Sequence, residues 1–133
     1  GLKNGPAHNE VMMTENGPML VEVNARFGGS MGPLINRECL GRGQLDAMMD
    51  VIFAPNRFMA ESKQGYKIKK HGLAVYFVSK DDEHVVNAKA VEQIKALPSF
   101  HSLGLIDPPG SKLTKTVDMF SMPGMVELVH IDS

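Results

Sequence analysis

The pattern around Asn16-Gly17 constrains the fold of this chain more than any other feature. Two runs rich in apolar residues, 10–14 and 19–24, flank the segment Glu15-Asn16-Gly17-Pro18. An Asn-Gly step between two such runs is the strongest short-range signal for a β-hairpin, because both residues accept left-handed backbone angles. The segment from 10 to 24 is therefore predicted to form two antiparallel strands joined by a tight turn.

The length of the turn decides which side chains share a face of this hairpin. A loop of three residues, 15–17, pairs Glu10 with Glu22, whereas a loop of two residues, 16–17, turns Glu10 towards apolar side chains. We favour the three-residue loop, with Gly17 left-handed, because it separates a polar face from an apolar face. The polar face then carries His8, Glu10, Glu22 and Asn24, and the apolar face carries Val11, Met13, Val21 and Val23.

The polar face offers two carboxylates and one amide carbonyl. Like charges directly opposite each other destabilise a sheet, and two carboxylates held together share a proton or hold a cation. Mg²⁺ prefers oxygen ligands, and zinc is disfavoured because this segment has one histidine and no cysteine. The pattern predicts a metal site at Glu10, Glu22 and Asn24; ordinary solvated side chains are the alternative.

Arg26 and a glycine-rich turn follow the second strand. Arg26 lies two residues beyond Asn24, so alternation keeps it on the polar face. An always-charged, forked donor beside a metal suits a phosphate or a developing oxyanion. The turn Gly28-Gly29-Ser30 offers backbone N–H groups and a helix start, which can bind an anion, although a lone Gly-Gly often marks only a turn.

The remaining residues predict an α+β chain. Its expected helices are 33–40, 44–53 and 88–97, and its expected strands are 73–78, 116–120 and 125–131. The run 73–78 is apolar nearly throughout and is predicted to be a central strand. These elements suggest three segments: a catalytic segment 1–54, a connection 55–71 and a C-terminal α+β module 72–133.

Composition excludes several classes of partner. The 14 basic and 15 acidic side chains leave no positive excess for nucleic acid. No apolar run approaches the roughly 20 residues that a membrane helix needs. The single cysteine, Cys39, cannot form an internal disulfide, which favours a cytoplasmic location.

The motif string resembles a known family. The segments 5–10 (GPAHNE) and 17–29 (GPMLVEVNARFGG) are similar to the C-terminal part of ATP-grasp carboxylate–amine ligases, most closely those that join amino acids. The resemblance implies the C-terminal part of an ATP-grasp fold, ATP as a substrate, and Mg²⁺ (or Mn²⁺) held by Glu10, Glu22 and Asn24. It further implies that Arg26 holds the transferred phosphate, and that Gly28, Gly29 and Ser30 contact the acceptor substrate.

The resemblance also implies a reaction. A carboxylate attacks the γ-phosphate of ATP to give an acyl phosphate and ADP, and an amine then displaces phosphate to form an amide. Family members carry an earlier lysine-bearing subdomain that clamps the nucleotide, and only nine residues precede Glu10 here. We therefore expect a fragment that needs the missing N-terminal part of the ligase and is inactive alone.

Two other functions remain open at this stage. A non-catalytic interaction module could pair strand edges of the segment 72–133 with a second copy, and the methionines 119, 122 and 125 would then be exposed. A hydrolase could use Glu10 and Glu22 as acid and base, but that scheme leaves Asn24 and Arg26 without a role.

Overall fold

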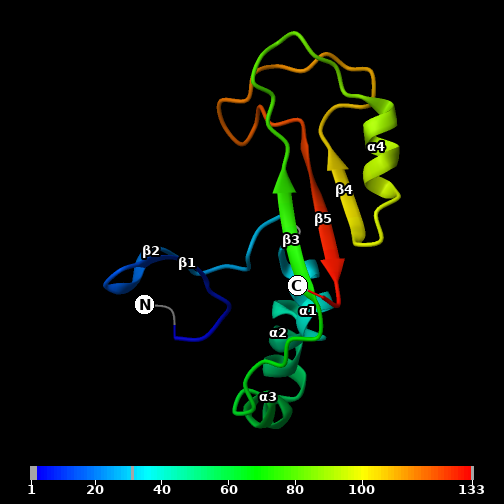
Figure 1. The fold of residues 1–133 in the computed structure, drawn as a ribbon. Coiled ribbons are helices and arrows are strands. Elements are labelled where there is room, and N and C mark those ends of the chain that lie inside the picture. The colour runs from blue at the N-terminus through cyan, green and yellow to red at the C-terminus, as the bar shows by residue number, and fades with distance from the viewer. Residues whose placement is uncertain (1–2, 31, 133) are drawn as a thin grey trace. The chain divides into compact units, whose positions relative to one another are not determined.

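The computed structural model describes residues 3–30 and 32–132, and the chain divides between Lys69 and Lys70 into two compact units. The first unit contains a hairpin and three helices: β1 (His8–Thr14), β2 (Gly17–Asn24), α1 (Gly32–Leu40), α2 (Gln44–Phe53) and α3 (Pro55–Glu61). The second contains β3 (His71–Tyr76), α4 (Ala88–Lys95), β4 (Phe100–Leu105) and β5 (Gly124–His130) (Figure 1). Antiparallel strands with helices confirm the predicted α+β class.

Hydrogen bonds of the Thr14 side chain and the backbone conformation of Gly17 form the turn between β1 and β2. The Thr14 hydroxyl donates to the Gly17 carbonyl at 2.8 Å and accepts from the Asn16 N–H at 3.2 Å. Gly17 has φ of +98°, the left-handed conformation that was predicted. Thr14 pairs with Gly17, so the residues between the paired positions are Glu15 and Asn16.

A β-bulge then changes the register along the hairpin. Near the turn Val11 pairs with Leu20, but beyond the bulge Glu10 pairs with Glu22. Val21 is the extra residue between these pairs. The predicted pairs at the polar face are therefore confirmed, whereas the uniform register of a three-residue loop is wrong. Val21, expected among the paired apolar residues, has no partner residue in β1.

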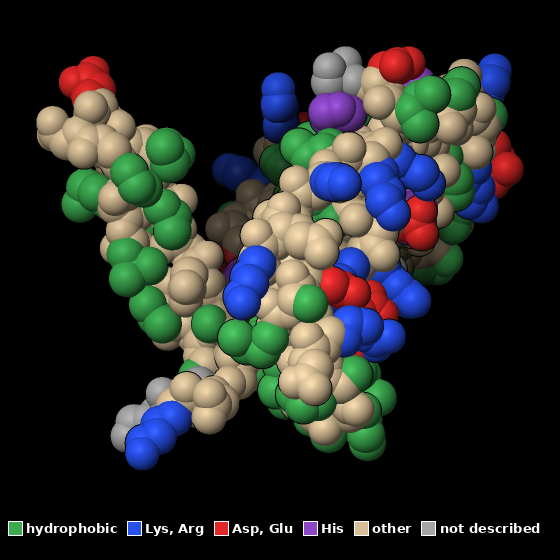
Figure 2. All heavy atoms as spheres, turned by 90° about the horizontal axis from the view of Figure 1, so that it is seen from below, with side chains coloured by type: hydrophobic (Ala, Val, Ile, Leu, Met, Phe, Trp, Pro, Cys, Tyr) green, Lys and Arg blue, Asp and Glu red, His purple; other side chains and the backbone are tan. Residues whose placement is uncertain are grey.

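Hydrophobic side chains cover much of the hairpin surface (Figure 2, left). Those more than half exposed are Val11, Met12, Met13, Met19, Leu20, Val21 and Val23. They come from both faces of the strand pair, because successive side chains of a strand point to opposite sides.

Each helix of the first unit begins or ends at a recognisable residue. Gly41 ends α1 with φ of +76°, and its N–H donates to the Arg37 carbonyl at 2.7 Å. The Asp46 carboxylate accepts from the Gly43 N–H at 2.9 Å and so caps the start of α2. Pro55 stops α2 as predicted, but it also occupies the first turn of α3, where its missing N–H costs nothing. The segment 55–71, treated as a connection above, therefore begins with a helix.

A network of ion pairs joins α2 to α3. The Asp50 carboxylate is only 4% exposed and accepts hydrogen bonds from Arg42 and Arg57. Arg42 also pairs with Glu61 at the end of α3. A buried carboxylate is tolerated here because two guanidinium groups replace its hydration.

The second unit is built on a three-stranded sheet in the order β3-β5-β4, with both pairs antiparallel. The helix α4 lies beside β4 (Figure 1). The Asn87 side chain caps α4 by accepting from the N–H groups of Lys89 and Ala90. Val91 of α4 and Val126 of β5 are among the most buried apolar side chains.

Two predictions for this unit were wrong, and one strand was missed. The apolar β3 lies at an edge of the described sheet, and β5 is central. The sequence did not indicate this order because Glu127 interrupts the apolar pattern of β5, although Glu127 is only 1% exposed. The strand β4 was missed, since Ser102, Gly104 and a bulge at its start hide the alternation. Residues 116–120 form no strand because Asp118 accepts from the N–H groups of Phe120 and Ser121 and folds the chain into a turn.

Within the described ranges 3–30 and 32–132, no helix is long and apolar enough to cross a membrane.

We expect Asp50→Asn to lower the free energy of unfolding of α2 by about 3 kcal/mol, because two guanidinium groups lose a buried partner. Hydrogen exchange of the α2 amides would measure this loss. The control is Arg37→Ala, which breaks the exposed 3.3 Å pair with Asp46 and should cost at most about 1 kcal/mol. Equal losses for the two variants would contradict a special role for Asp50.

Candidate functional site

The centre of the candidate site is the pair of carboxylates that face each other across the hairpin. Glu10 of β1 lies directly opposite Glu22 of β2. Both side chains are exposed, and the structure gives neither one a hydrogen bond or ion pair among the described residues. Two like charges held opposite each other without a counter-charge are suited to bind a cation.

Asn24 extends this polar face by one pair of residues. It lies opposite His8 and is half-buried. Its amide nitrogen is buried without a hydrogen-bond partner. Because the nitrogen is turned into the protein, the amide oxygen is the atom that Asn24 can offer to a ligand.

The donor set fits a hard cation. Two carboxylates and one amide oxygen match the ligands that Mg²⁺ and Mn²⁺ prefer. Among the described residues there is no cluster of three or more histidine, cysteine, aspartate or glutamate side chains that could hold a metal. Glu10, Glu22 and Asn24 offer two carboxylates and one amide oxygen. These three groups are too few to fill the coordination shell of Mg²⁺, so a substrate would have to supply the other ligands.

Arg26 follows β2 and lies at the same end of the hairpin as His8. Its Nη1 atom lies 3.5 Å from His8 Nδ1 and donates to the Phe27 carbonyl at 3.0 Å. The side chain is exposed, and among residues 3–30 and 32–132 no carboxylate forms an ion pair with it. The guanidinium therefore keeps donors for an incoming anion.

One backbone N–H group of the glycine-rich turn is hydrogen-bonded to a side chain of the same chain. The Gly28 N–H donates to the Gln44 side-chain oxygen at 3.0 Å, so this amide already has a partner within the chain. Gly29 is exposed with open space around its Cα. Ser30 has φ of +57°, an uncommon angle for a residue other than glycine. The roles of Gly28, Gly29 and Ser30 in substrate binding stay predictions.

Gln44 was missed at the sequence level. Its side chain contacts both the glycine-rich turn and the residue before β1, since the amide nitrogen donates to the Ala7 carbonyl at 3.4 Å. A glutamine at the first position of a helix carries no signal for such contacts, which join residues 16 and 37 positions apart.

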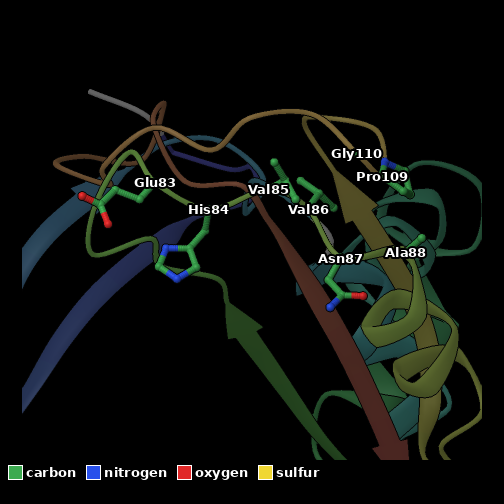
Figure 3. Close-up of a pocket in the computed structure, with 8 residues that line it drawn as sticks. All are labelled: Glu83, His84, Val85, Val86, Asn87, Ala88, Pro109 and Gly110. Carbon is green, nitrogen blue, oxygen red and sulfur yellow. The ribbon is translucent and has the colours of Figure 1, made fainter.

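A separate hollow of about 600 Å³ lies in the second unit (Figure 3). It is lined by Glu83, His84, Val85, Val86, Asn87, Ala88, Pro109 and Gly110. The N-terminus of α4 opens on it, but Asn87 already caps the first amides of the helix. Two N–H groups at the start of α4 therefore already have a partner within the chain.

His84 and Asp81 form an exposed pair next to this hollow. The His84 Nδ1 atom lies 2.6 Å from the Asp81 carboxylate, and this hydrogen bond raises the pKa of His84. The pKa of Asp81 is lowered, first by the Glu83 N–H and then by His84. The pair is fully formed only between the lowered pKa of Asp81 and the raised pKa of His84.

The comparisons with known proteins agree with the fold. The chain has the fold of the C-terminal part of an ATP-grasp ligase, which confirms the resemblance seen in its motifs. It is similar to dapdiamide A synthase of Enterobacter agglomerans, with 31% identity over 127 residues, which cover 95% of this chain. The chain spans 30% of the length of that curated relative. No protein-family model matches the chain.

Two solved structures share the fold. The L-amino acid ligase from Bacillus licheniformis aligns with a TM-score of 0.73 and 19% identity, over 99% of this chain and 32% of the ligase. Phosphoribosylglycinamide synthetase from Anaerococcus prevotii aligns with a TM-score of 0.62 and 14% identity, over 94% of this chain and 31% of that protein.

We expect the pKa of His84 to lie above its ordinary value of 6.5 in an NMR titration, and Asp81→Asn to return it to that value. The contact contributes its full stability between the ordinary pKa values of Asp81, 3.8, and His84, 6.5; this contribution is lost as the pH rises through the raised pKa of His84 and as it falls through the lowered pKa of Asp81. Asp82→Asn is the control and should leave the His84 pKa raised. No change with Asp81→Asn would contradict the assigned cause.

Proposed function

We propose that this chain supplies the metal- and phosphate-binding part of an ATP-dependent carboxylate–amine ligase. The observation that carries the proposal is that Glu10 and Glu22 face each other without a positively charged partner among the described residues. The bulge in β2 places them on the same face as Asn24, and Arg26 follows at the end of the hairpin. The similarity to dapdiamide A synthase supports it. The rest of such a ligase would be the partner of this chain, because the chain spans 30% of that relative.

Glu10, Glu22 and Asn24 would hold Mg²⁺, or Mn²⁺, together with the phosphates of ATP. The bound metal would neutralise charge on the transferring phosphoryl group. The chain's own contribution is to place three oxygen donors on one face of a rigid strand pair, where the register keeps them together.

Arg26 would hold the transferred phosphate. In the proposed reaction a carboxylate oxygen attacks the γ-phosphorus and ADP leaves; an amine nitrogen then attacks the acyl carbon, and inorganic phosphate leaves with the proton that the nitrogen gives up. Each step moves negative charge between oxygens, so a fixed guanidinium stabilises it without giving up a proton.

The names of the relatives suggest the substrate class. A ligase of L-amino acids shares the fold, and we propose amino-acid-like carboxylates and amines as substrates here. The ATP requirement agrees with the cytoplasmic location that the lone Cys39 suggested. Gly28, Gly29 and Ser30 would contact the acceptor, and the space beside the Gly29 Cα is open for it.

Calorimetry with Mn²⁺ and ATP on the longest natural chain that carries this sequence tests the proposal. We expect Glu22→Gln to weaken metal–ATP binding at least about tenfold, because it removes one of two carboxylates from the site. The matched control is Glu15→Gln, an exposed carboxylate in the turn of the same hairpin. Binding that survives Glu22→Gln would overturn the ligase proposal.

The 133-residue chain by itself should show little or no ATPase activity, since it spans 30% of the related synthase. ATP hydrolysis by this chain that disappears with Glu22→Gln would show that the nucleotide site is complete within it.

A second candidate function, an interaction module that dimerises, is favoured by the turn 117–120. Val117, Met119 and Phe120 are 77%, 65% and 89% exposed. The Asp118 carboxylate accepts from the hydroxyl and the N–H of Ser121 and from the N–H of Phe120, and these bonds lower the pKa of Asp118. The expectation that the nearby methionines are all exposed is wrong for Met122 and Met125, which are half-buried.

If the turn pairs two copies of the chain, sedimentation velocity should show a dimer that Phe120→Ser converts to a monomer. Removing an exposed phenylalanine from an isolated turn should leave the fold intact, which circular dichroism would check. A monomer at all concentrations would exclude this second function.

A further inference from the structure

Gln44 joins two separate backbone segments of the candidate site through one side chain. Its Oε1 atom accepts from the Gly28 N–H at 3.0 Å, and its Nε2 atom donates to the Ala7 carbonyl at 3.4 Å. Ala7 directly precedes β1, and Gly28 lies in the turn that follows β2. One side-chain amide thus connects the residue before β1 with the turn after β2.

The two bridged segments carry the side chains that meet at the end of the hairpin. His8 follows Ala7, and Arg26 lies two residues before Gly28; their side-chain nitrogens are 3.5 Å apart. A Cβ atom on Gly28 would lie 3.5 Å from Gln44 Oε1 and 3.7 Å from His8 Cδ2. The side chains of His8 and Gln44 therefore both lie close to Gly28.

Stability of α2 does not explain the contacts of Gln44. Asp46 already caps the helix through the Gly43 N–H, so the first turn does not need the glutamine amide. The two contacts instead require a side chain that accepts at one end and donates at the other, which only an amide of this length provides. Glutamate could keep the bond to Gly28 but not the bond to Ala7.

We propose that Gln44 is a positioning residue that fixes the glycine-rich turn, and with it Arg26, relative to the carboxylates of the hairpin. This inference rests on the proposed function, because it gives Arg26 a reacting group to reach. Misplacement of a catalytic group by about 1 Å can cost about a hundredfold in rate. Loss of the bridge should therefore reduce kcat while the metal–ATP site on β1 and β2 keeps its donors.

The test uses the longest natural chain that carries this sequence, with Gln44→Met and Gln44→Glu. We expect Gln44→Met to lower kcat of ligation by about ten- to a hundredfold, with the KM for ATP within about twofold of the parent value. Gln44→Glu should recover most of the lost kcat, because the carboxylate still accepts from Gly28, which makes the shorter of the two bonds. Gln64→Met, on an exposed glutamine of the same unit, is the matched control.

A second readout follows the bridge without catalysis. The Gly28 amide should be protected from hydrogen exchange in the parent chain and in Gln44→Glu, and should exchange freely in Gln44→Met. A Gly28 amide that is unprotected in the parent chain would overturn the bridge. Lost protection in Gln44→Met with unchanged kcat would overturn the positioning role.

The two proposals fail in different ways. If Glu22→Gln leaves ligation unchanged, the proposed function is wrong whatever the Gly28 amide shows. If Glu22→Gln abolishes ligation but Gln44→Met does not lower it, the ligase function stands and the inference about Gln44 falls.

Discussion

The pairing of Glu10 with Glu22 is the contact around which the candidate site is arranged, and it is an unfavourable one. Like charges directly opposite on a sheet cost a few tenths of a kcal/mol to about 1 kcal/mol. The register of the turn alone would place Glu10 opposite Val21, because Thr14 pairs with Gly17 and Val11 with Leu20. The bulge at Val21 shifts the pairing by one residue and brings the two carboxylates together. Bulges that redirect side chains in this way are common next to active sites.

Acidic groups are treated differently in the two parts of the first unit. Asp50 is buried, and two arginines satisfy it, so its charge is used to join α2 and α3. Glu10 and Glu22 are exposed and carry no such partner in the described geometry. An arginine placed against the hairpin pair would relieve the repulsion, yet Arg26 contacts His8 and the Phe27 carbonyl instead. This separation keeps the carboxylates available for a cation and the guanidinium available for an anion.

Local chemistry allowed the sequence to predict α1, α2, the left-handed Gly17 and the pairing of the polar residues. Each of these depends on residues close in the chain, such as Gly41 after α1 or Pro55 after α2. The bulge at Val21 could not be predicted, because it depends on how the turn and the polar pairs compete for register. The same holds for β4 and for Gln44, whose positions follow from contacts with distant residues. Gly124 is an example of such a distant contact. A Cβ atom on Gly124 would lie 2.3 Å from the Gly104 carbonyl oxygen, so the close approach of β4 and β5 at this point requires glycine.

The exposure of the hairpin explains why the proposed ligand is a metal–nucleotide complex and not a metal alone. Two unit charges about 4 Å apart interact by only about 1 kcal/mol in water, because the solvent screens them. Two exposed carboxylates and one amide oxygen also leave much of an octahedral shell to other ligands. Phosphate oxygens can fill those positions and at the same time engage the guanidinium of Arg26. Each charged group of the polar face would then gain a partner of opposite sign, and the proposed complex would offset the cost of holding Glu10 against Glu22.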